Sequence, residues 1–238
     1  MNIAVVIAAG KGNRTGQDIP KQFLNVYDKP IIIYTLNAFQ NHPLIDAIEI
    51  VCLDGWQDML LAYCKQFGIA KLKWIVKGGD TGQESLRNGI YNLENEIKKD
   101  DIVIIHDGIR PMVSEDVITD CIEKCKIYGS GVTVLPVTEQ IFSVGDSEKS
   151  SDYIPRENLR IMQTPQAYKY EKVFNGYKKA FAENIGITGS AYTNTMLADL
   201  GEELYFALGS SKNIKITTKN DIEIFKAMLA ADESAWLK

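Results

Sequence analysis

A glycine-rich, basic segment follows the first apolar run of the chain. It reads AAGKGNRTGQDIPKQF from Ala8 to Phe23 and carries three glycines together with the cations Lys11, Arg14 and Lys21. Glycines leave backbone N–H groups accessible, and such groups bind polyphosphates when lysine and arginine lie beside them. The same composition also occurs in solvated surface loops. The segment alone therefore leaves two interpretations open, a polyphosphate-binding loop and an ordinary loop.

Two better-known nucleotide-binding loops do not fit this spacing. A dinucleotide-binding turn needs G-x-G-x-x-G before a helix, and here the third glycine, Gly16, comes one residue late. A Walker A loop needs Gly-Lys-Ser/Thr at a fixed distance from its first glycine, and neither Gly10 nor Gly12 meets that requirement. An NAD-dependent reductase is therefore disfavoured. Whether the purified protein binds NADH tests this alternative directly.

Polar residues also follow other apolar runs. The segment DIVIIHDGIRP places Asp107 and Arg110 just after one run, and WIVKGGDTGQES places Gly79 and Asp80 after another. A carboxylate beside a basic loop is a natural ligand for the magnesium ion of a nucleoside triphosphate. The glycine turn allows close backbone approach to a base or ribose. A late segment, NIKITT, adds Lys215.

These residues need a scaffold that brings them to one edge. Seven runs read as β-strands, and most are almost continuously apolar, as in strands covered on both faces. They are NIAVVIAA, AIEIVCL, KLKWIVKGG, DIVIIHDG, GVTVLPV, ELYFAL and NIKITT. Amphipathic stretches alternate with them and begin near Pro30, Trp56, Gln83, Ser114, Tyr170 and Lys219. The alternation predicts an α/β sandwich with a mostly parallel sheet, in which ligands bind at the carboxyl ends of the strands.

One segment, 138–166, interrupts this alternation. A polar Gly-Asp-Ser turn separates two short β-like pieces there, which predicts a β-hairpin arm that projects from the sheet. The rest of the chain contains no repeat and no low-complexity tract. We therefore expect residues 1–238 to form a single domain that carries this arm.

Composition limits the classes of function. The net charge is −5 and the isoelectric point is about 5.2, which argues against a general nucleic-acid or membrane-surface binder. The apolar start is too short for a signal peptide or a membrane span, so we expect a cytoplasmic protein. The four cysteines lack C-x-x-C spacing, and only two histidines could join them in a zinc site. We expect buried free thiols.

Taken together and in order, these motifs resemble the cytidylyltransferases that make CDP-methylerythritol and CDP-ribitol. AAGKGNRTG…PKQF is similar to the nucleotide loop of that family, IHDGIRP to its His-Asp-Ala-x-Arg-Pro, QTPQAY to its Gln-Thr-Pro-Gln segment, and NIKITT to its late lysine strand. The resemblance covers nearly the whole chain. It implies a Rossmann-like three-layer nucleotidyltransferase fold that uses CTP, a polyol phosphate and Mg²⁺ to form a CDP-polyol and pyrophosphate.

The resemblance also assigns roles to residues. Arg14 and Lys21 would hold the triphosphate and neutralise the departing pyrophosphate, Lys215 would bind the α-phosphate under attack, and Asp107 would hold magnesium. The residues implied to contact the nucleotide are Ala8, Ala9, Gly10, Gly12, Gly79, Asp80 and Ser85. This set suffices chemically, because in-line attack by a phosphate oxygen needs alignment and charge neutralisation more than a general base.

The polyol phosphate is implied to contact Arg110, Arg156 and Thr164. In the family the arm crosses to a second copy and completes its site, so the resemblance implies a homodimer with shared sites. Without the resemblance, Arg156 also reads as a solvated charge on an exposed hairpin.

The chain departs from the methylerythritol enzymes where the second substrate should lie. Their Thr-Asp-Asp/Glu-Ala is replaced by AYTN at 191–194, their Asp-Thr pair in the arm by Glu139 and Gln140, and a frequent arginine by Gly82. Hydrogen-bonding sites discriminate strongly between hydroxyl patterns. We therefore expect ribitol 5-phosphate or a related polyol phosphate that feeds a teichoic acid or capsule, with methylerythritol 4-phosphate as the alternative.

A different class of function is a catalytically silent nucleotide-binding module on the same fold. The joint presence of Arg14, Lys21, Asp107 and Lys215 argues against it, because a binding module needs no cation at every phosphate.

Overall fold

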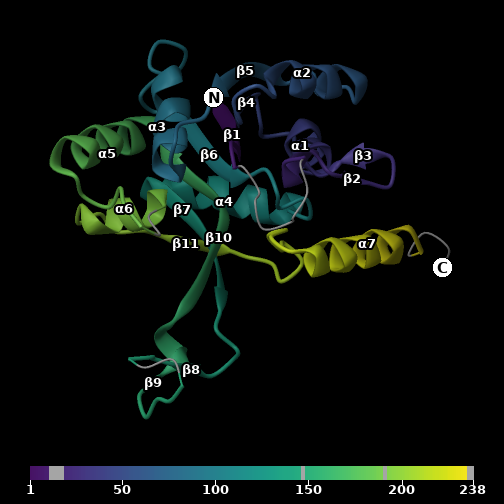
Figure 1. Ribbon diagram of the computed structural model, residues 1–238. Coiled ribbons are helices and arrows are strands. Elements are labelled where there is room, and N and C mark those ends of the chain that lie inside the picture. Colours follow the sequence, from purple (N-terminus) through teal and green to yellow (C-terminus); the bar gives the residue numbers. More distant parts are fainter. Residues whose placement is uncertain (11–18, 146–147, 190–191, 235–238) are drawn as a thin grey trace.

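A seven-stranded sheet forms the centre of the molecule, in the order β11-β7-β10-β6-β1-β4-β5 (Figure 1). The computed structural model describes residues 1–10, 19–145, 148–189 and 192–234. The strands are β1 (Asn2–Ala8), β4 (Ala47–Cys52), β5 (Leu72–Lys77), β6 (Ile102–Asp107), β7 (Ser130–Pro136), β10 (Arg160–Lys169) and β11 (Phe206–Leu208). All neighbouring strands are parallel except β10, which runs antiparallel to β6 and β7. The predicted mostly parallel sheet is confirmed.

Helices cover both faces of the sheet. They are α1 (Ile31–Asn41), α2 (Gln57–Gln66), α3 (Gly82–Asn92), α4 (Glu115–Tyr128), α5 (Tyr170–Glu183), α6 (Thr193–Asp199) and α7 (Lys219–Ser234). Along β1, Ala4 and Val6 pack into the hydrophobic cluster that contains α1, α2 and α4, whereas Ile3 and Val5 pack into the cluster that contains α3, α5 and α6. Alternate side chains of a strand point to opposite faces, so a continuously apolar strand fills both layers. The result is the predicted three-layer sandwich.

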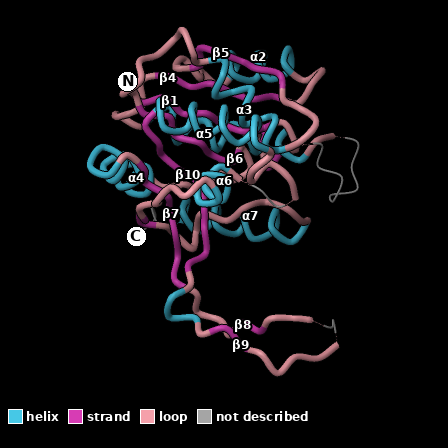
Figure 2. Tube along the Cα trace, turned by 90° about the vertical axis from the view of Figure 1, so that its left-hand side faces the viewer, coloured by secondary structure: helices cyan, strands magenta, loops and turns pink. Residues whose placement is uncertain are grey.

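The hairpin arm projects from one end of the sandwich (Figures 1 and 2). Its outer part pairs β8 (Ile141–Phe142) with β9 (Tyr153–Ile154). The chain leaves the sheet through β7 and returns through β10, whose register shifts between Met162 and Gln166. The inner part of the segment 138–166 is therefore part of the central sheet, and it connects the arm directly to the strand ends beside β6.

The expected strand at 213–218 is wrong, because these residues pair with no strand in the part of the chain that the structure describes. One backbone bond, from the Ile216 N–H to the Ile109 carbonyl at 2.9 Å, fixes the segment beside the turn after β6. Ile214 and Ile216 pack with Ile31 and Phe225 in a third hydrophobic cluster. The short elements that remain are η2 (Lys21–Phe23), β2 (Asn25–Val26), β3 (Lys29–Pro30) and η3 (Arg156–Asn158).

The cysteines are free and buried, as expected, at positions 52, 64, 121 and 125. Burial raises the pKa of the Cys52 thiol to about 12, so it stays protonated at neutral pH. Among the described residues, no group of three histidine, cysteine, aspartate or glutamate side chains could hold a metal ion. None of the described helices is both long enough and apolar enough to cross a membrane.

Candidate active site

A cavity of about 350 Å³ lies where the first strand, the β5–α3 turn and the end of β6 meet. Its walls include Ile7 from β1, Leu53 after β4 and Leu86 from α3. Many of the residues predicted from the sequence line it: Ala9, Gly10, Gly79, Asp80, Ser85, Asp107, Thr164 and Lys215. The fold therefore gathers residues from distant segments at one edge of the sheet, as expected for parallel strands.

The loops after β1 and β5 lie very close together at this cavity. A Cβ atom added to Gly78 would lie 2.4 Å from the Cβ of Ala9 and 3.3 Å from the carbonyl oxygen of Cys52. The Gly78 N–H donates to that carbonyl at 2.8 Å. Glycine is therefore required at position 78, because any side chain would separate the loops after β1 and β5 that line the cavity.

A capping box shapes the turn between β5 and α3. The Thr81 hydroxyl accepts from the Glu84 N–H at 3.1 Å, and the Glu84 carboxylate accepts from the N–H groups of Thr81 and Asp80. The Ser85 hydroxyl accepts from the Gly79 N–H at 3.0 Å and donates to the Thr81 carbonyl at 2.9 Å. Ser85 thus holds the Gly79 backbone in place, and its direct contact with a nucleotide stays a prediction.

Gln22 fixes the base of the glycine-rich loop. Its side-chain amide donates to the carbonyls of Ala8 at 2.8 Å and Gly10 at 3.0 Å, and the side chain is buried. Lys21 precedes it in η2 and is only 8% exposed. Ala8, at the end of β1, is also buried, and the residues that line the cavity do not include it. The predicted residues Gly12 and Arg14 lie outside the described residues.

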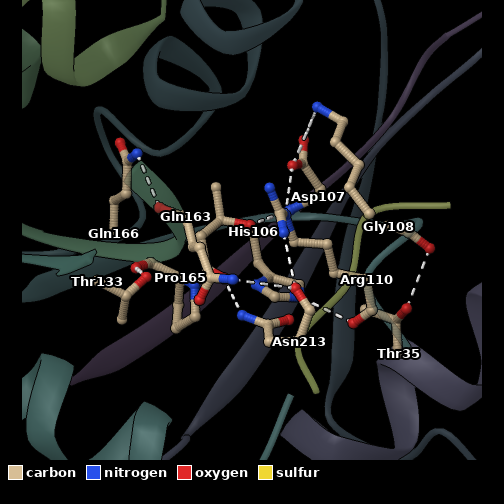
Figure 3. A network of polar contacts seen from close by, with 12 residues as sticks. Thr35, His106, Asp107, Gly108, Arg110, Thr133, Gln163, Pro165, Gln166 and Asn213 are labelled. Carbon is tan, nitrogen blue, oxygen red and sulfur yellow. Dashed lines mark hydrogen bonds and ion pairs between the residues drawn. The ribbon is translucent and has the colours of Figure 1, made fainter. Parts of the chain in front are cut away.

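Asp107 lies at the centre of a charged cluster at the end of β6 (Figure 3). Its Oδ2 accepts from the Arg110 Nε at 3.0 Å and lies 3.1 Å from the Lys215 Nζ. Its backbone N–H donates to the Thr164 hydroxyl at 3.1 Å. Burial raises the pKa of Asp107, but the cations of Lys215 and Arg110 outweigh burial and hold the pKa below its ordinary value. The group is a carboxylate at neutral pH.

His106 is the buried neighbour of this cluster and is neutral. Its Nε2 lies 3.2 Å from the Arg110 carbonyl, and its ring packs edge-on against Phe39. Burial lowers the pKa of His106 to about 4. A neutral imidazole inside the core supports the turn between Asp107 and Arg110 and does not contribute positive charge to the site.

Asn213 joins three parts of the site, and sequence reasoning did not single it out. The side chain is completely buried, and its amide donates to the Thr164 carbonyl at 2.7 Å. The backbone carbonyl of Asn213 accepts from the Arg110 guanidinium at 2.7 Å. Lys215 follows two residues later. Asn213 thus holds the Thr164–Pro165 segment of β10 and the Arg110 side chain against the segment that carries Lys215.

A second cavity, also about 350 Å³, adjoins the first. The residues that line both are Asp107, Thr164, Gln166, Tyr192 and Lys215. Arg110, Met162, Gln163, Asn194 and Thr195 line the second cavity only. The pair formed by Asp107 and Lys215 therefore lies at the boundary between two cavities, one on the side of the glycine loops and one on the side of β10 and α6.

Arg156 lies apart from these cavities. It begins η3 on the arm, its side chain is exposed, and its guanidinium donates to the Thr138 carbonyl. It lines a hollow on the arm together with Phe142 and Tyr153. Figures 1 and 2 show the arm extending away from the sheet. Within one chain, the structure does not bring Arg156 to the other predicted residues.

The carboxylates at the first cavity fit magnesium as it binds beside nucleotides. Magnesium usually takes one or two protein carboxylates and completes its shell with phosphate oxygens and waters. Asp107 and Asp80 both line the cavity, and the carboxylate of Asp107 lies at the boundary with the second cavity. The described residues thus suit an ion shared with a triphosphate and do not suit a cage made of protein ligands alone.

Comparisons with known proteins identify the family of the chain. A model of the IspD family, described as 2-C-methyl-D-erythritol 4-phosphate cytidylyltransferase, matches residues 2–231. The chain is 51% identical to a ribitol-5-phosphate cytidylyltransferase of Lacticaseibacillus paracasei, over 98% of this chain and 100% of that protein. It is 37% identical to a 2-C-methyl-D-erythritol 4-phosphate cytidylyltransferase of Clostridium novyi, over 96% of each.

The fold also matches a solved structure. The crystal structure of the Francisella tularensis 2-C-methyl-D-erythritol 4-phosphate cytidylyltransferase has a TM-score of 0.79 and 29% identity to this chain, and the match covers 94% of this chain and 98% of that one. The family resemblance and the fold predicted from the sequence are confirmed. With its glycine-rich loop, its Asp107 cluster and its match over almost the whole length, the chain belongs to the IspD family of cytidylyltransferases.

Proposed function

We propose that this protein transfers a cytidylyl group from CTP to ribitol 5-phosphate or a related polyol phosphate and releases pyrophosphate. A phosphate oxygen of the acceptor forms a bond to the α-phosphorus of CTP, and the bond from that phosphorus to the bridging oxygen of the β-phosphate breaks. The observation that carries the proposal is the pair of adjoining cavities with Asp107 and Lys215 at their boundary. Two substrates in these cavities would meet at that pair.

The chain's own residues align and neutralise two anionic substrates. The acceptor phosphate is already ionised at neutral pH, so it needs no general base. Lys215 lines both cavities and is proposed to bind the α-phosphate, and Arg110 and Thr164 line the second cavity, which is proposed to hold the polyol phosphate. Lys21 and Arg14 are proposed to bind the triphosphate from the glycine-rich loop. When bound at Asp107, magnesium supplies charge neutralisation on the triphosphate and on the leaving pyrophosphate.

Ribitol 5-phosphate is favoured over methylerythritol 4-phosphate by two lines of support. The relative from L. paracasei, which carries the ribitol name, shares 51% identity, compared with 37% for the C. novyi relative that carries the methylerythritol name. The AYTN sequence at 191–194 replaces the Thr-Asp-Asp/Glu-Ala of the methylerythritol enzymes. Two of its residues, Tyr192 and Asn194, line the second cavity, which is proposed to hold the polyol phosphate and is called the acceptor cavity below. We propose that the product is CDP-ribitol, made in the cytoplasm for a cell-surface polymer.

We also propose a homodimer whose arms complete the neighbouring sites. The arm exposes large apolar side chains, among them Phe142 at 50% and Tyr153 at 68%. Such a surface on a narrow projection favours coverage by a partner. A second copy would also bring its Arg156 to the acceptor cavity, which one chain alone does not do.

Pyrophosphate release tests the proposal. CTP and magnesium are supplied with ribitol 5-phosphate, methylerythritol 4-phosphate, glycerol phosphate or mannitol phosphate, each separately, and Lys215→Ala serves as the inactive control. We expect the highest kcat/KM with ribitol 5-phosphate. A preference for methylerythritol 4-phosphate would move the protein to isoprenoid synthesis. CTP binding without turnover on any of the four would contradict the proposed reaction and favour a nucleotide-binding module.

A further inference from the structure

Most neutral polar side chains that line the acceptor cavity already have partners within the protein. The Gln163 amide donates to the Ser210 carbonyl at 3.0 Å and accepts from the Ser210 N–H at 3.2 Å. The Gln166 amide donates to the Gln163 carbonyl at 3.1 Å and accepts from the Tyr168 hydroxyl at 2.9 Å. These two amides shape the strand β10, and their donor and acceptor atoms are engaged before any substrate arrives.

Asn194 differs from them. Its side chain lines the same cavity and is only 6% exposed, yet no residue in the described part of the chain forms a hydrogen bond with it. Its two neighbours in α6 are engaged, since the Thr193 hydroxyl lies 2.8 Å from the Tyr177 hydroxyl and the Thr195 hydroxyl bonds the Tyr192 backbone. The fully buried, unpartnered side-chain atoms among the described residues do not include the Asn194 amide, so this amide keeps some accessible surface at the cavity. An accessible amide with no protein partner can bond a ligand that enters the cavity.

The chemistry of the Asn194 amide indicates which part of the polyol phosphate it would contact. A carboxamide offers both an acceptor oxygen and a donor NH₂ group, and a hydroxyl group is likewise both donor and acceptor. Arg110 and Lys215, which line the same cavity, are donors only and suit a phosphate. The cavity therefore combines a cationic side for the phosphate with one available neutral amide for the remainder of the molecule.

We propose that Asn194 hydrogen-bonds a hydroxyl group of the acceptor and thereby determines which polyol phosphate the enzyme uses. The inference rests on the proposed function, because it assigns the acceptor to the second cavity. A site that binds a hydroxyl through a buried amide rejects analogues that lack this hydroxyl, since the amide then stays unpaired. Asn194 is thus a specificity-determining residue and takes no part in the bond-making step.

The test pairs one substitution with substrates that lack single hydroxyl groups. The unmodified enzyme and Asn194→Leu are assayed with CTP and either ribitol 5-phosphate or its monodeoxy analogues. We expect the unmodified enzyme to lose roughly tenfold to a hundredfold in kcat/KM with the analogue that lacks the contacted hydroxyl. Asn194→Leu should lose about as much with ribitol 5-phosphate itself and should no longer distinguish the two substrates, while its KM for CTP changes less than about threefold.

A matched control and a second variant separate this role from a structural one. Asn175→Leu makes the same change on α5, in an exposed residue that lines a different hollow beside Lys169 and Lys172, and should leave the substrate preference unchanged. Asn194→Ala removes the amide without adding bulk and replaces the leucine variant if that variant does not fold. If both Asn194 variants are active and keep the preference of the unmodified enzyme among the analogues, the role of Asn194 is overturned and the proposed function still stands. An unmodified enzyme that turns over no polyol phosphate overturns the proposed function as well.

Discussion

The ammonium nitrogen of Lys215 lies 3.1 Å from the Oδ2 atom of Asp107, although the two residues are more than one hundred positions apart in the chain. The cation proposed to bind the α-phosphate is thus neutralised in the protein without substrate. Triphosphate binding must therefore break this ion pair, so that phosphate oxygens replace Asp107 as the partner of Lys215. The Asp107 carboxylate repels phosphate oxygens unless a divalent cation lies between them.

Substitution of Asp107 by asparagine should separate CTP binding from catalysis. Without a divalent metal, the affinity of Asp107→Asn for CTP should equal or exceed that of the unmodified enzyme, because a negative charge beside the triphosphate is removed. With magnesium, kcat should fall roughly a hundredfold or more, because the proposed metal ligand is lost. Calorimetric titration of CTP with and without a chelator, together with pyrophosphate release, measures both. Unchanged turnover in the folded variant would contradict the metal role of Asp107.

The lysines of the site should matter for rate more than for stability. Lys21→Ala and Lys215→Ala each remove a cation proposed to neutralise charge that develops in the transition state, so kcat should fall on the order of a hundredfold or more. Lys219→Ala, on the exposed first turn of α7, is the matched control and should keep full activity. Thermal unfolding of all three variants shows whether the fold is intact. A folded Lys215→Ala variant with normal turnover would remove Lys215 from the mechanism.

Asn213 should act through the residues that it holds. Asn213→Ala removes the hydrogen bond to the Thr164 carbonyl, so the KM for the polyol phosphate should rise roughly tenfold while the KM for CTP changes little. Thr133→Val removes a comparable buried hydrogen bond, from the Thr133 hydroxyl to the Pro165 carbonyl at 2.8 Å, on the adjoining strand. This control should lower the unfolding free energy without the rise in KM. Equal kinetic effects of both substitutions would indicate a purely structural role for Asn213.

Mixed oligomers should reveal shared sites. Arg156→Ala inactivates the arm and Lys215→Ala inactivates the body, so each variant alone should be nearly inactive. In a mixed dimer, one site receives an intact body from one chain and an intact arm from the other. If subunits exchange randomly, activity should return to about a quarter of the unmodified rate. Assays after subunit exchange at equal concentrations measure this recovery, and its absence would contradict sites completed by a partner's arm.

Glu49 should make the stability of the protein depend on pH. This side chain is fully buried in β4, and its Oε2 accepts from the Asn92 amide at 2.7 Å. Burial raises the pKa of Glu49 from 4.5 to about 8. The folded carboxyl thus keeps its proton between about pH 4.5 and 8, whereas the unfolded carboxyl loses it. The stabilisation from Glu49 is complete below pH 4.5 and is lost as the pH rises toward 8.

Glu49→Gln should remove this pH dependence. The variant should match the unmodified protein near pH 5 and exceed it in unfolding free energy near pH 8, by a difference on the order of a few kcal/mol. Urea unfolding at several pH values measures the difference. Glu183→Gln, at the exposed end of α5, should behave like the unmodified protein. An unfolding free energy for Glu49→Gln that falls with pH as steeply as in the unmodified protein would show that another group titrates.

Periodicity predicted the layers well and misassigned two segments. NIKITT alternates polar and apolar residues because Ile214 and Ile216 pack into a cluster beside α7, and this burial pattern imitates a strand without any strand pairing. The second segment is β10, whose residues 160–166 the sequence prediction assigns to the arm, whereas they pair with β6 and β7 in the central sheet. Pro165 lies within this strand, although proline is unfavourable in a central strand. That proline is tolerated because the pairing register shifts between Met162 and Gln166.

The charged residues of the site were predictable, whereas the amides were not. Asp107, Arg110 and Lys215 follow apolar runs or stand in a recognisable motif, and the structure brings them together. Gln22 and Asn213 act through side-chain hydrogen bonds to backbone carbonyls inside the fold, which leave no periodic trace in the sequence. Arg156 depends on a second chain for its proposed role, so neither the sequence pattern nor one copy of the fold can place it.

Different segments of the chain line most of each of the two adjoining cavities. The glycine loops after β1 and β5 form most of one wall, and β10 with α6 forms most of the other, while only the residues at their boundary serve both. Within α6, Asn194 and Thr195 line only the second cavity, whereas Thr193 lines the first. Changes at Asn194 and Thr195 can therefore alter the choice of polyol phosphate without touching the nucleotide side. An enzyme built in this way is open to redesign: new CDP-alcohols become accessible by replacing a few residues of one short helix, while CTP use and the chemistry of transfer are inherited unchanged.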